Sequence, residues 1–424
     1  MKRIIAATLT VSVLLLTAKS QAGTDTWNQL SGGNASGSWN TAANPPWSTG
    51  ALPGATDTAD FSTVNITADS TVTLDGNQSI NALIFGDTTT TSAAGWILSP
   101  GTPATSTLTL SGTTPTITVN ALGTGKVATI SAVLAGTAGL IKAGTGTLTL
   151  SASNTYSGGT TFSNTLIVGA QGALGTGSVT GTSPAILQFN TPANATFTNA
   201  LTLAAPDANS INNQSTTATI TLNGNIVATA PNYFTIVGQG ANNAGFVLGG
   251  SNVCSTRFVL KNAALTLASN NAVIASTYPR ISLGDEAGSG ASVYLANGVT
   301  ESLKVVDANN NAITGAVFTV GMQSAGVSTF SGTGSSGVAV ELHSLSTGGT
   351  NCAWNFEADS GATVTFSGII LNTGSNTNLP IAKTGAGTVV FSATNTYAGA
   401  TTIQNGTLTG VVGCLLYTSP SPRD

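Results

Sequence analysis

Short runs in which aliphatic and hydroxyl residues alternate recur along most of the chain. Residues 106–110 read STLTL, residues 147–150 read TLTL, and residues 362–366 read ATVTF. A period of two places the aliphatic side chains on one face of a strand and threonine on the other, so each run predicts a half-buried β-strand. Clusters of Gly, Asn and Ser separate the runs, and these residues tolerate the left-handed backbone of tight corners. No long stretch carries apolar residues at helical spacing with caps, so an all-β fold is predicted.

One sequence unit occurs twice with little change. Residues 142–169 read KAGTGTLTLSASNTYSGGTTFSNTLIVG, and residues 383–410 read KTGAGTVVFSATNTYAGATTIQNGTLTG. A degenerate copy, FVLGGSNVCSTRFVLKNAALTL, occupies residues 246–267, with Cys254 standing where Tyr156 does. A unit that returns in this way predicts a stack of coils rather than a sandwich.

The order of residues inside the unit predicts three short strands without a hairpin return. The first strand holds Leu148, the second begins at Phe162, and the third follows at Leu166. Asn154 is expected at a corner between strands, with Tyr156 packed beside it. This order is typical of a right-handed parallel β-helix, or β-solenoid, in which each strand pairs with its equivalent in the next coil. Stacking is required because one coil buries too few side chains to offset its backbone entropy.

The two ends of the chain differ in composition from the middle. Residues 1–22 are predicted to be a secretory signal peptide, because a basic start and an apolar run lead to the small-x-small site Ser20-Gln21-Ala22. The apolar run is shorter than a membrane-spanning helix, and no later segment of residues 23–413 replaces it. Residues 414–424, which begin at Cys414, read CLLYTSPSPRD and look like a translated sequencing adapter, so we expect a non-native tail ending at Asp424. The natural chain is then expected to continue past Gly413.

Between these ends we predict two regions of one continuous domain, because no linker sequence separates them. Residues 102–413 form the β-helix proper. Residues 23–101 are predicted to be an N-terminal cap with the first coils, because an open stack exposes a raw sheet edge. This region carries four of the five tryptophans, for which packing is favoured over sugar binding: Trp27, Trp39, Trp47 and Trp96.

Charge is sparse and mostly acidic. Of the 11 basic and 15 acidic residues, four basic and one acidic lie outside residues 23–413, which leaves a net charge of −7 for that segment. This negative net charge argues against nucleic acid and anionic membrane as partners, since both require basic patches. The mean hydropathy of +0.26 does not fit a disordered chain.

The two cysteines of the repeat region are predicted to be reduced. Cys254 and Cys352 are 98 residues apart, which corresponds to about four coils. At ~4.8 Å per coil they lie about 20 Å apart, beyond the ~7 Å reach of a disulfide.

Catalytic chemistry has few candidates. The single histidine, His343, precedes Ser344, but neighbours in a strand point to opposite faces, so a catalytic pair is geometrically poor. One histidine and two cysteines are too few ligands for zinc. No catalytic residue, cofactor-binding residue or metal ligand is therefore assigned.

Carboxylates leave two alternatives open. β-Helices also include polysaccharide lyases and glycoside hydrolases, which need a base and a cation within hydrogen-bond reach. Stacked coils could supply these from the densest charge of the chain, although such residues are more often solvated: Arg257, Lys261, Arg280, Asp285, Glu286, Glu301, Lys304 and Asp307. A calcium site is the second alternative, although the spacing matches no calcium loop: Asp57, Asp60, Asp69, Asp75 and Asp87.

The two unit copies resemble the autotransporter-associated β-strand repeat family, also called the passenger-associated transport repeat family. In that family a Lys-Thr-Gly-x-Gly-Thr-Leu start leads through Asn-Thr-Tyr-x-Gly to a Gly-Thr-Leu close, and residues 383–408 match nearly throughout. The first copy lacks the glycine before Thr165, which shortens one turn. The openings WNTAANPPWSTGALPGATDTADFS and FGDTTTTSAAGWILS extend the resemblance into residues 39–62 and 85–99.

The resemblance implies an exported passenger, displayed at the cell surface or released, with an outer-membrane translocator or anchor as partner. It brings no catalytic residues. The sequence therefore favours a non-enzymatic adhesive or structural scaffold that contacts a surface glycan or a protein. The alternative is a glycan-active enzyme that uses residues 257–307.

Overall fold

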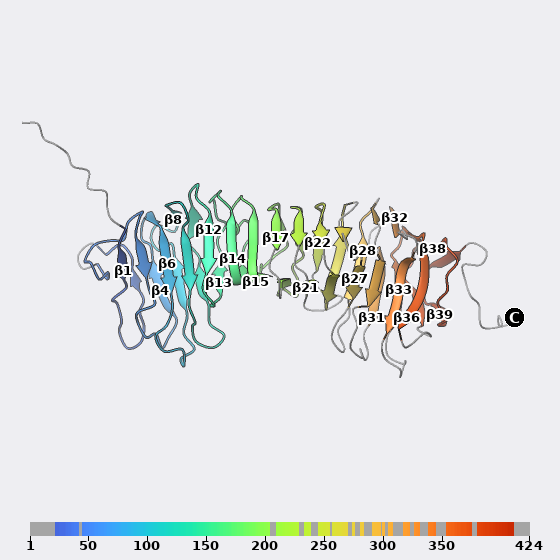
Figure 1. The fold of residues 1–424 in the computed structure, drawn as a ribbon, viewed down its shortest axis with the longest axis horizontal. Helices are drawn as coiled ribbons and strands as arrows, with labels where there is room; N and C mark the ends of the chain where they lie inside the picture. Colours follow the sequence, from blue (N-terminus) through green and yellow to red (C-terminus); the bar gives the residue numbers. More distant parts are fainter. Residues whose placement is uncertain are drawn as a thin grey trace, which may run out of the picture.

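The chain winds into an elongated stack of β-coils (Figure 1). The computed structural model describes residues 22–41, 45–203, 209–228, 233–238, 245–254, 257–269, 274–275, 280–283, 291–297, 299–301, 304–307, 317–322, 326–330, 338–344, 353–374 and 380–410. Every pairing between named strands is parallel, and coils follow one another along the long axis. The prediction of an all-β, parallel β-helix is confirmed.

The strands form columns that run along the stack. The first column consists of β1 (Thr24–Thr26), β3 (Thr58–Asp60), β6 (Ala82–Phe85), β9 (Thr116–Val119), β12 (Leu140–Ala143), β14 (Thr160–Val168), β15 (Val179–Phe189), β17 (Leu201–Leu203), β20 (Ile226–Ala228), β23 (Val253–Cys254) and β26 (Ile274–Ala275). The second consists of β2 (Gly37–Ser38), β4 (Ser70–Thr73), β7 (Trp96–Ser99), β10 (Ala128–Ile130), β13 (Leu148–Leu150), the later parts of β14 and β15, β18 (Asn209–Asn213), β21 (Tyr233–Val237), β24 (Arg257–Lys261), β27 (Arg280–Leu283), β30 (Lys304–Asp307), β33 (Val338–Ser344) and β36 (Ile369–Gly374).

Three shorter columns complete the coils. One holds β5 (Gln78–Ile80), β8 (Thr107–Leu110) and β11 (Val133–Ala135). Another holds β16 (Ala195–Phe197), β19 (Ile220–Leu222), β22 (Phe246–Leu248), β25 (Ala264–Leu267), β28 (Ala291–Leu295), β31 (Val317–Met322), β34 (Ala353–Ala358), β37 (Ile381–Thr384) and β39 (Thr401–Ile403). The last holds β29 (Thr300–Glu301), β32 (Gly326–Phe330), β35 (Ala362–Phe366), β38 (Thr388–Phe391) and β40 (Thr407–Gly410).

Coil length varies, and the sequence unit is longer than one coil. Gly37 pairs with Val72, 35 residues later, whereas Leu148 pairs with Leu166, only 18 residues later. The start and the end of the first unit are therefore stacked on each other in successive coils.

The prediction of three separate strands in the unit is right for the second copy and wrong for the first. In the second copy, β38, β39 and β40 are distinct. In the first copy, Phe162 and Leu166 share the continuous strand β14, which shifts register between Ser163 and Asn164. Asn164 has a φ of 59° at the place where the second copy has Gly406, with a φ of 71°. A left-handed asparagine thus replaces the missing glycine, and the turn is one residue shorter, as expected.

The core follows the alternation of the sequence. Leu148, Leu150, Leu166 and Val168 are buried, while the intervening Thr149 is partly exposed. The aliphatic interior of successive coils is continuous along the described part of the stack. Burial of these side chains against the neighbouring coil is the main stabilising contribution.

The tryptophans of the first coils form a buried aromatic cluster. Trp47 lies 5.0 Å from Trp27 and 4.8 Å from Trp39 between ring centroids, and Phe61 packs against all three rings. The indole of Trp27 donates a hydrogen bond to the carbonyl of Ala35 at 2.8 Å. The predicted packing role of these tryptophans is confirmed, since Trp96 is buried as well.

Several predictions concern residues or side chains outside the described part of the chain. These are the signal peptide up to residue 21, the tail of residues 414–424, and Cys352. The backbone of Cys254 lies in β23, but its side chain is outside the described set. In the part of the chain that is described, no helix is long and apolar enough to cross a bilayer.

Candidate functional site

Each clear copy of the unit buries a lysine whose ammonium group is held by backbone carbonyls. Lys142 lies at an inward position of β12, in register with the buried residues Ile117 and Phe162 of the adjacent coils. Its side chain is 1% exposed. Nζ donates hydrogen bonds to the carbonyl oxygens of Gly144 (3.0 Å), Gly146 (2.6 Å) and Ser163 (2.9 Å). The lysine therefore ties the turn after its own strand to the next coil.

The second copy repeats this arrangement with small differences. Lys383 is also 1% exposed. Its Nζ donates to the carbonyl oxygens of Thr384 (2.6 Å), Gly385 (2.7 Å) and Asn405 (3.0 Å). A buried ammonium is tolerated only where hydrogen bonds compensate for its lost hydration, and three carbonyls offset part of that loss in both copies. We call these two arrangements the lysine–carbonyl sites.

Burial shifts the titration of both lysines. Loss of hydration lowers the pKa of Lys142 to about 8. Burial also lowers the pKa of Lys383, where the nearby carboxylates of Glu357 and Asp359 act in the opposite direction. The pKa of Glu357 is raised by burial and by Asp359, and lowered by Lys383. The two sites therefore share geometry but differ in electrostatic surroundings.

The lowered pKa of Lys142 predicts a pH-dependent stability. Between pH 8 and the ordinary lysine pKa of 10.5, the unfolded chain binds a proton that the folded chain has released. The contribution of Lys142 to the free energy of unfolding therefore increases as the pH rises from 8 to 10.5. Below pH 8 both states are protonated, and this increase is absent. Urea unfolding of the wild type and a Lys142→Met variant at pH 7, 8.5 and 10 is expected to give a stability difference that widens with pH. A difference that stays constant or narrows would contradict the assignment.

Three asparagines form a second recurrent polar feature. Asn154, Asn252 and Asn395 are buried at equivalent positions of the three unit copies. Their Oδ1 atoms accept hydrogen bonds from the backbone N–H groups of Leu134 (2.8 Å), Ile226 (2.8 Å) and Ile370 (2.9 Å), respectively. Each bond joins an asparagine at a corner to a neighbouring coil. The predicted corner role of Asn154 is confirmed, and the degenerate copy keeps this contact through Asn252.

The tyrosine of the unit packs beside this corner, as predicted. The Tyr156 hydroxyl lies 2.6 Å from Oγ1 of Thr160, and the Tyr397 hydroxyl lies 2.8 Å from Oγ1 of Thr401. Both rings are buried. Burial raises the pKa of the Tyr156 phenol, which therefore stays protonated at physiological pH.

A Tyr156→Phe substitution is expected to lower the free energy of unfolding by about 1 kcal/mol, because Thr160 loses a buried partner while the ring packing is kept. Urea unfolding monitored by circular dichroism measures this loss. Tyr397→Phe is the matched variant, and it should give a change of the same size. A neutral result for both would show that the hydroxyl pair adds nothing to stability.

The aspartates considered for calcium act as local caps of the first coils. Asp57, Asp60, Asp75 and Asp87 accept hydrogen bonds from backbone N–H groups of nearby turns. Asp69 accepts from the Gly95 N–H at 2.9 Å and pairs with Lys126 at 2.9 Å. Lys126 lowers the pKa of Asp69. Within the described residues no three His, Cys, Asp or Glu side chains come together as a metal site.

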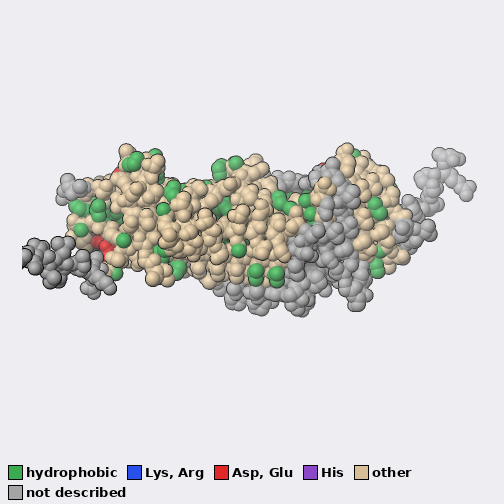
Figure 2. All heavy atoms as spheres, turned by 90° about the horizontal axis from the view of Figure 1, so that it is seen from above, with side chains coloured by type: hydrophobic (Ala, Val, Ile, Leu, Met, Phe, Trp, Pro, Cys, Tyr) green, Lys and Arg blue, Asp and Glu red, His purple; other side chains and the backbone are tan. Residues whose placement is uncertain are grey.

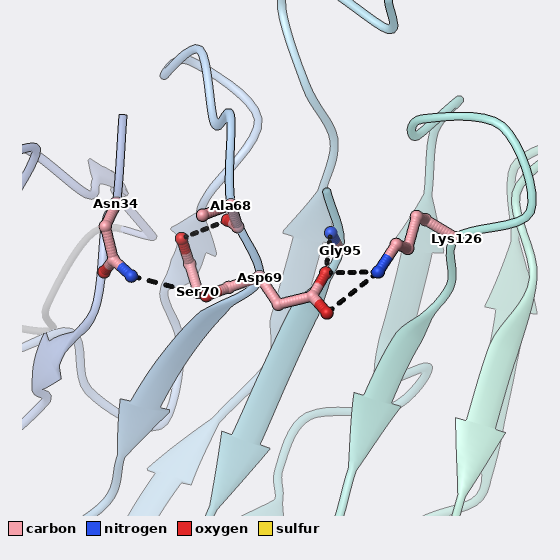
Figure 3. A network of polar contacts seen from close by, with 6 residues as sticks. All are labelled: Asn34, Ala68, Asp69, Ser70, Gly95 and Lys126. Carbon is pink, nitrogen blue, oxygen red and sulfur yellow. Dashed lines mark hydrogen bonds and ion pairs between the residues drawn. The ribbon is translucent and has the colours of Figure 1, made fainter. Parts of the chain in front are cut away.

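The Asp69 network crosses several coils (Figure 3). The Asn34 amide donates to the Asp69 carbonyl at 3.4 Å, and the Asp69 carboxylate reaches Gly95 and Lys126 in the following coils. The charged side chains in Figure 3 are thus engaged with each other and with the backbone. This network connects coils of the N-terminal region.

Some of the charged residues considered for an enzyme lie on the second column of strands. Arg280 pairs in register with Lys304, and Arg257 directly precedes Phe258, which pairs with Ile281. The backbone therefore places Arg257, Arg280 and Lys304 at one register position of β24, β27 and β30. Glu301 lies in β29, on another column, and Asp307 is in register with Leu283. Asp285 and Glu286 lie outside the described residues, and Lys261 is partly exposed at the end of β24.

The pair His343 and Ser344 lies at the end of β33. His343 is in register with Thr373, and Ser344 is in register with Gly374. Their side chains are outside the described set, so the expected opposite orientation stays a prediction.

The lysine–carbonyl sites are not predicted by the alternation of the sequence. Both units begin with a lysine two residues before Gly-x-Gly, and this constant spacing was the available signal. A lone lysine at a strand end normally indicates a solvated side chain, so alternation alone does not reveal an inward ammonium.

The fold and its recurrent sites define a parallel β-solenoid whose coils are joined by buried lysine, asparagine and tyrosine side chains. Two segments of the chain match the passenger-associated-transport-repeat family, at residues 140–164 and 381–409. The chain thus carries two passenger-associated transport repeats, and both lysine–carbonyl sites fall inside them. No curated protein and no solved structure matches the chain.

Proposed function

We propose that the chain is an exported passenger that acts, without catalysis, as a scaffold for adhesion or cell-to-cell contact. The observation that carries this proposal is that three lysines are used in contacts within the fold. Lys142 and Lys383 are buried on carbonyl oxygens, and Lys126 is paired with Asp69. These three lysines are therefore engaged in structural contacts rather than held free for catalysis. The two transport repeats support export and an outer-membrane translocator or anchor as partner.

The outer surface supports contact through hydrogen bonds rather than through charge. Thr161, Thr180 and Thr202 occupy one register position on three successive coils and are partly exposed. Figure 2 shows a face dominated by uncharged polar side chains and backbone, with scattered apolar groups and few charges. A long hydroxyl-bearing face fits a surface glycan or an extended protein as ligand.

The experiment is surface display followed by an adhesion assay. Cells that express the chain with an outer-membrane translocator are compared with cells that carry the translocator alone. We expect protease-accessible protein at the surface, with increased clumping or binding to immobilised polysaccharides and proteins. Display without any gain in adhesion over the translocator alone would contradict the adhesive role.

The glycan-active enzyme remains the second candidate, and the register of Arg257, Arg280 and Lys304 is the observation that favours it. Incubation with uronate-containing polysaccharides, followed by reducing-end and ultraviolet detection, tests this candidate. The scaffold proposal expects no products. Product formation that is lost in Arg280→Ala and kept in Lys126→Met would replace it with the enzyme.

A further inference from the structure

Among the residues that the structure describes, the parallel ladder of the stack starts at Gly23. The Gly23 carbonyl accepts a hydrogen bond from the Thr58 N–H at 2.8 Å, and β1 begins at the next residue. Gly23 and Ala22 are both exposed. The junction between Ala22 and Gly23 therefore lies at the surface, and it follows the small-x-small site Ser20-Gln21-Ala22.

A carboxylate is already placed at the nitrogen of Gly23. The Gly23 backbone nitrogen donates to Oδ1 of Asp57 at 2.9 Å. The other oxygen, Oδ2, accepts the N–H of Gly54 at 2.8 Å, so the turn fixes the orientation of the carboxylate. The contact spans 34 residues and joins the start of β1 to the turn before β3 in the next coil.

We propose that proteolytic cleavage between Ala22 and Gly23 creates an α-ammonium group that forms an ion pair with Asp57. Hydrolysis of the Ala22–Gly23 amide adds one water, leaving a carboxylate on Ala22 and an ammonium on Gly23. Before cleavage the same nitrogen is an amide with a single N–H directed at Asp57. After cleavage the bond becomes charge-assisted, which is the stronger type. Maturation thereby fastens the edge strand of the stack to its second coil.

Two measurements test this proposal. The first is N-terminal sequencing of the chain exported by a bacterial host, where we expect Gly23 as the first residue. An exported chain that starts at another residue, or that keeps its leader, overturns the cleavage site.

The second measurement is the rate of acylation of the α-amine at pH 7 in a chain that begins at Gly23. The reagent attacks only the neutral amine, whose pKa is ordinarily ~8. A neighbouring carboxylate favours the charged form, so Asp57 should slow acylation roughly two- to fivefold relative to Asp57→Asn. Asp60→Asn is the matched control, because Asp60 bonds Ser62 and should leave the rate unchanged.

A chain that begins at Ala22 provides a second variant with Asp57 intact. Its amine is displaced by one residue and should react as fast as in Asp57→Asn, with the circular dichroism of the stack unchanged. Equal rates in all four chains would overturn the ion pair while leaving the scaffold function untouched. If the displayed chain increases adhesion but its α-amine is not acylated more slowly, the ion pair is wrong and the proposed function stands.

Discussion

Replacement of Lys142 by methionine is expected to lower the free energy of unfolding by about 3 kcal/mol at pH 7. Methionine keeps an unbranched apolar stem at the inward position between Ile117 and Phe162 but donates no hydrogen bond. The carbonyl oxygens of Gly146 and Ser163 then lose their lysine partner in an almost fully enclosed place, whereas the Gly144 carbonyl keeps the hydrogen bond from the Asn164 amide at 3.1 Å. Each unsatisfied buried acceptor costs about 1–3 kcal/mol, and partial hydration of the turn reduces the sum.

Lys126→Met is the matched control for this prediction. It removes the same ammonium group from a partly exposed side chain whose carboxylate partner is also exposed. The expected change is therefore below about 1 kcal/mol. Because a solenoid need not unfold in one step, urea unfolding is best combined with hydrogen exchange of β13 and β14. Equal losses for the two lysines, or no faster exchange in these strands, would contradict a stabilising lysine–carbonyl site.

The parallel stack could be predicted because its determinants are local and periodic. The alternation around Leu148 and around Leu166 predicts which face of each strand is buried. The recurring unit implies that each of these strands pairs with an equivalent strand in the next coil. The structure buries both residues and pairs them with each other. The position of Asn154 was predictable for the same reason, since an asparagine between two alternating runs marks a corner.

The coil length and the lysine–carbonyl sites could not be predicted in this way. Coil length depends on which strands pair, and the sequence does not state that Leu166 stacks on Leu148 rather than starting a new face. The inward direction of Lys142 depends on carbonyls that converge only after the Gly144 turn and β14 are in place. An isolated charge in a strand is usually solvated, so tertiary contacts decide against the local expectation.

Replacement of Gly144 by alanine is expected to be at least as damaging as the loss of the lysine, at about 3 kcal/mol or more. Gly144 has a φ of +79°, which costs an alanine roughly 1–2 kcal/mol. A Cβ at this position would also overlap the backbone carbonyl of Val119 in the preceding coil, which has no flexible atom that can move aside. The turn must then shift, which moves the Gly144 carbonyl away from Lys142. The substitution therefore strains the backbone and also weakens the lysine–carbonyl site.

Gly125→Ala separates these two causes. Gly125 has a φ of +72°, but a Cβ there meets no atom within 4 Å. It should therefore show the conformational cost alone, about 1–2 kcal/mol. Gly385→Ala should behave like Gly144→Ala, because its Cβ would overlap the carbonyl of Ala358 in the equivalent position of the second copy. If urea unfolding gave the same loss for Gly125 and Gly144, close contact between coils would not be the reason for glycine in the repeat. A larger loss at both repeat positions ties the Gly-x-Gly motif to the spacing of the coils.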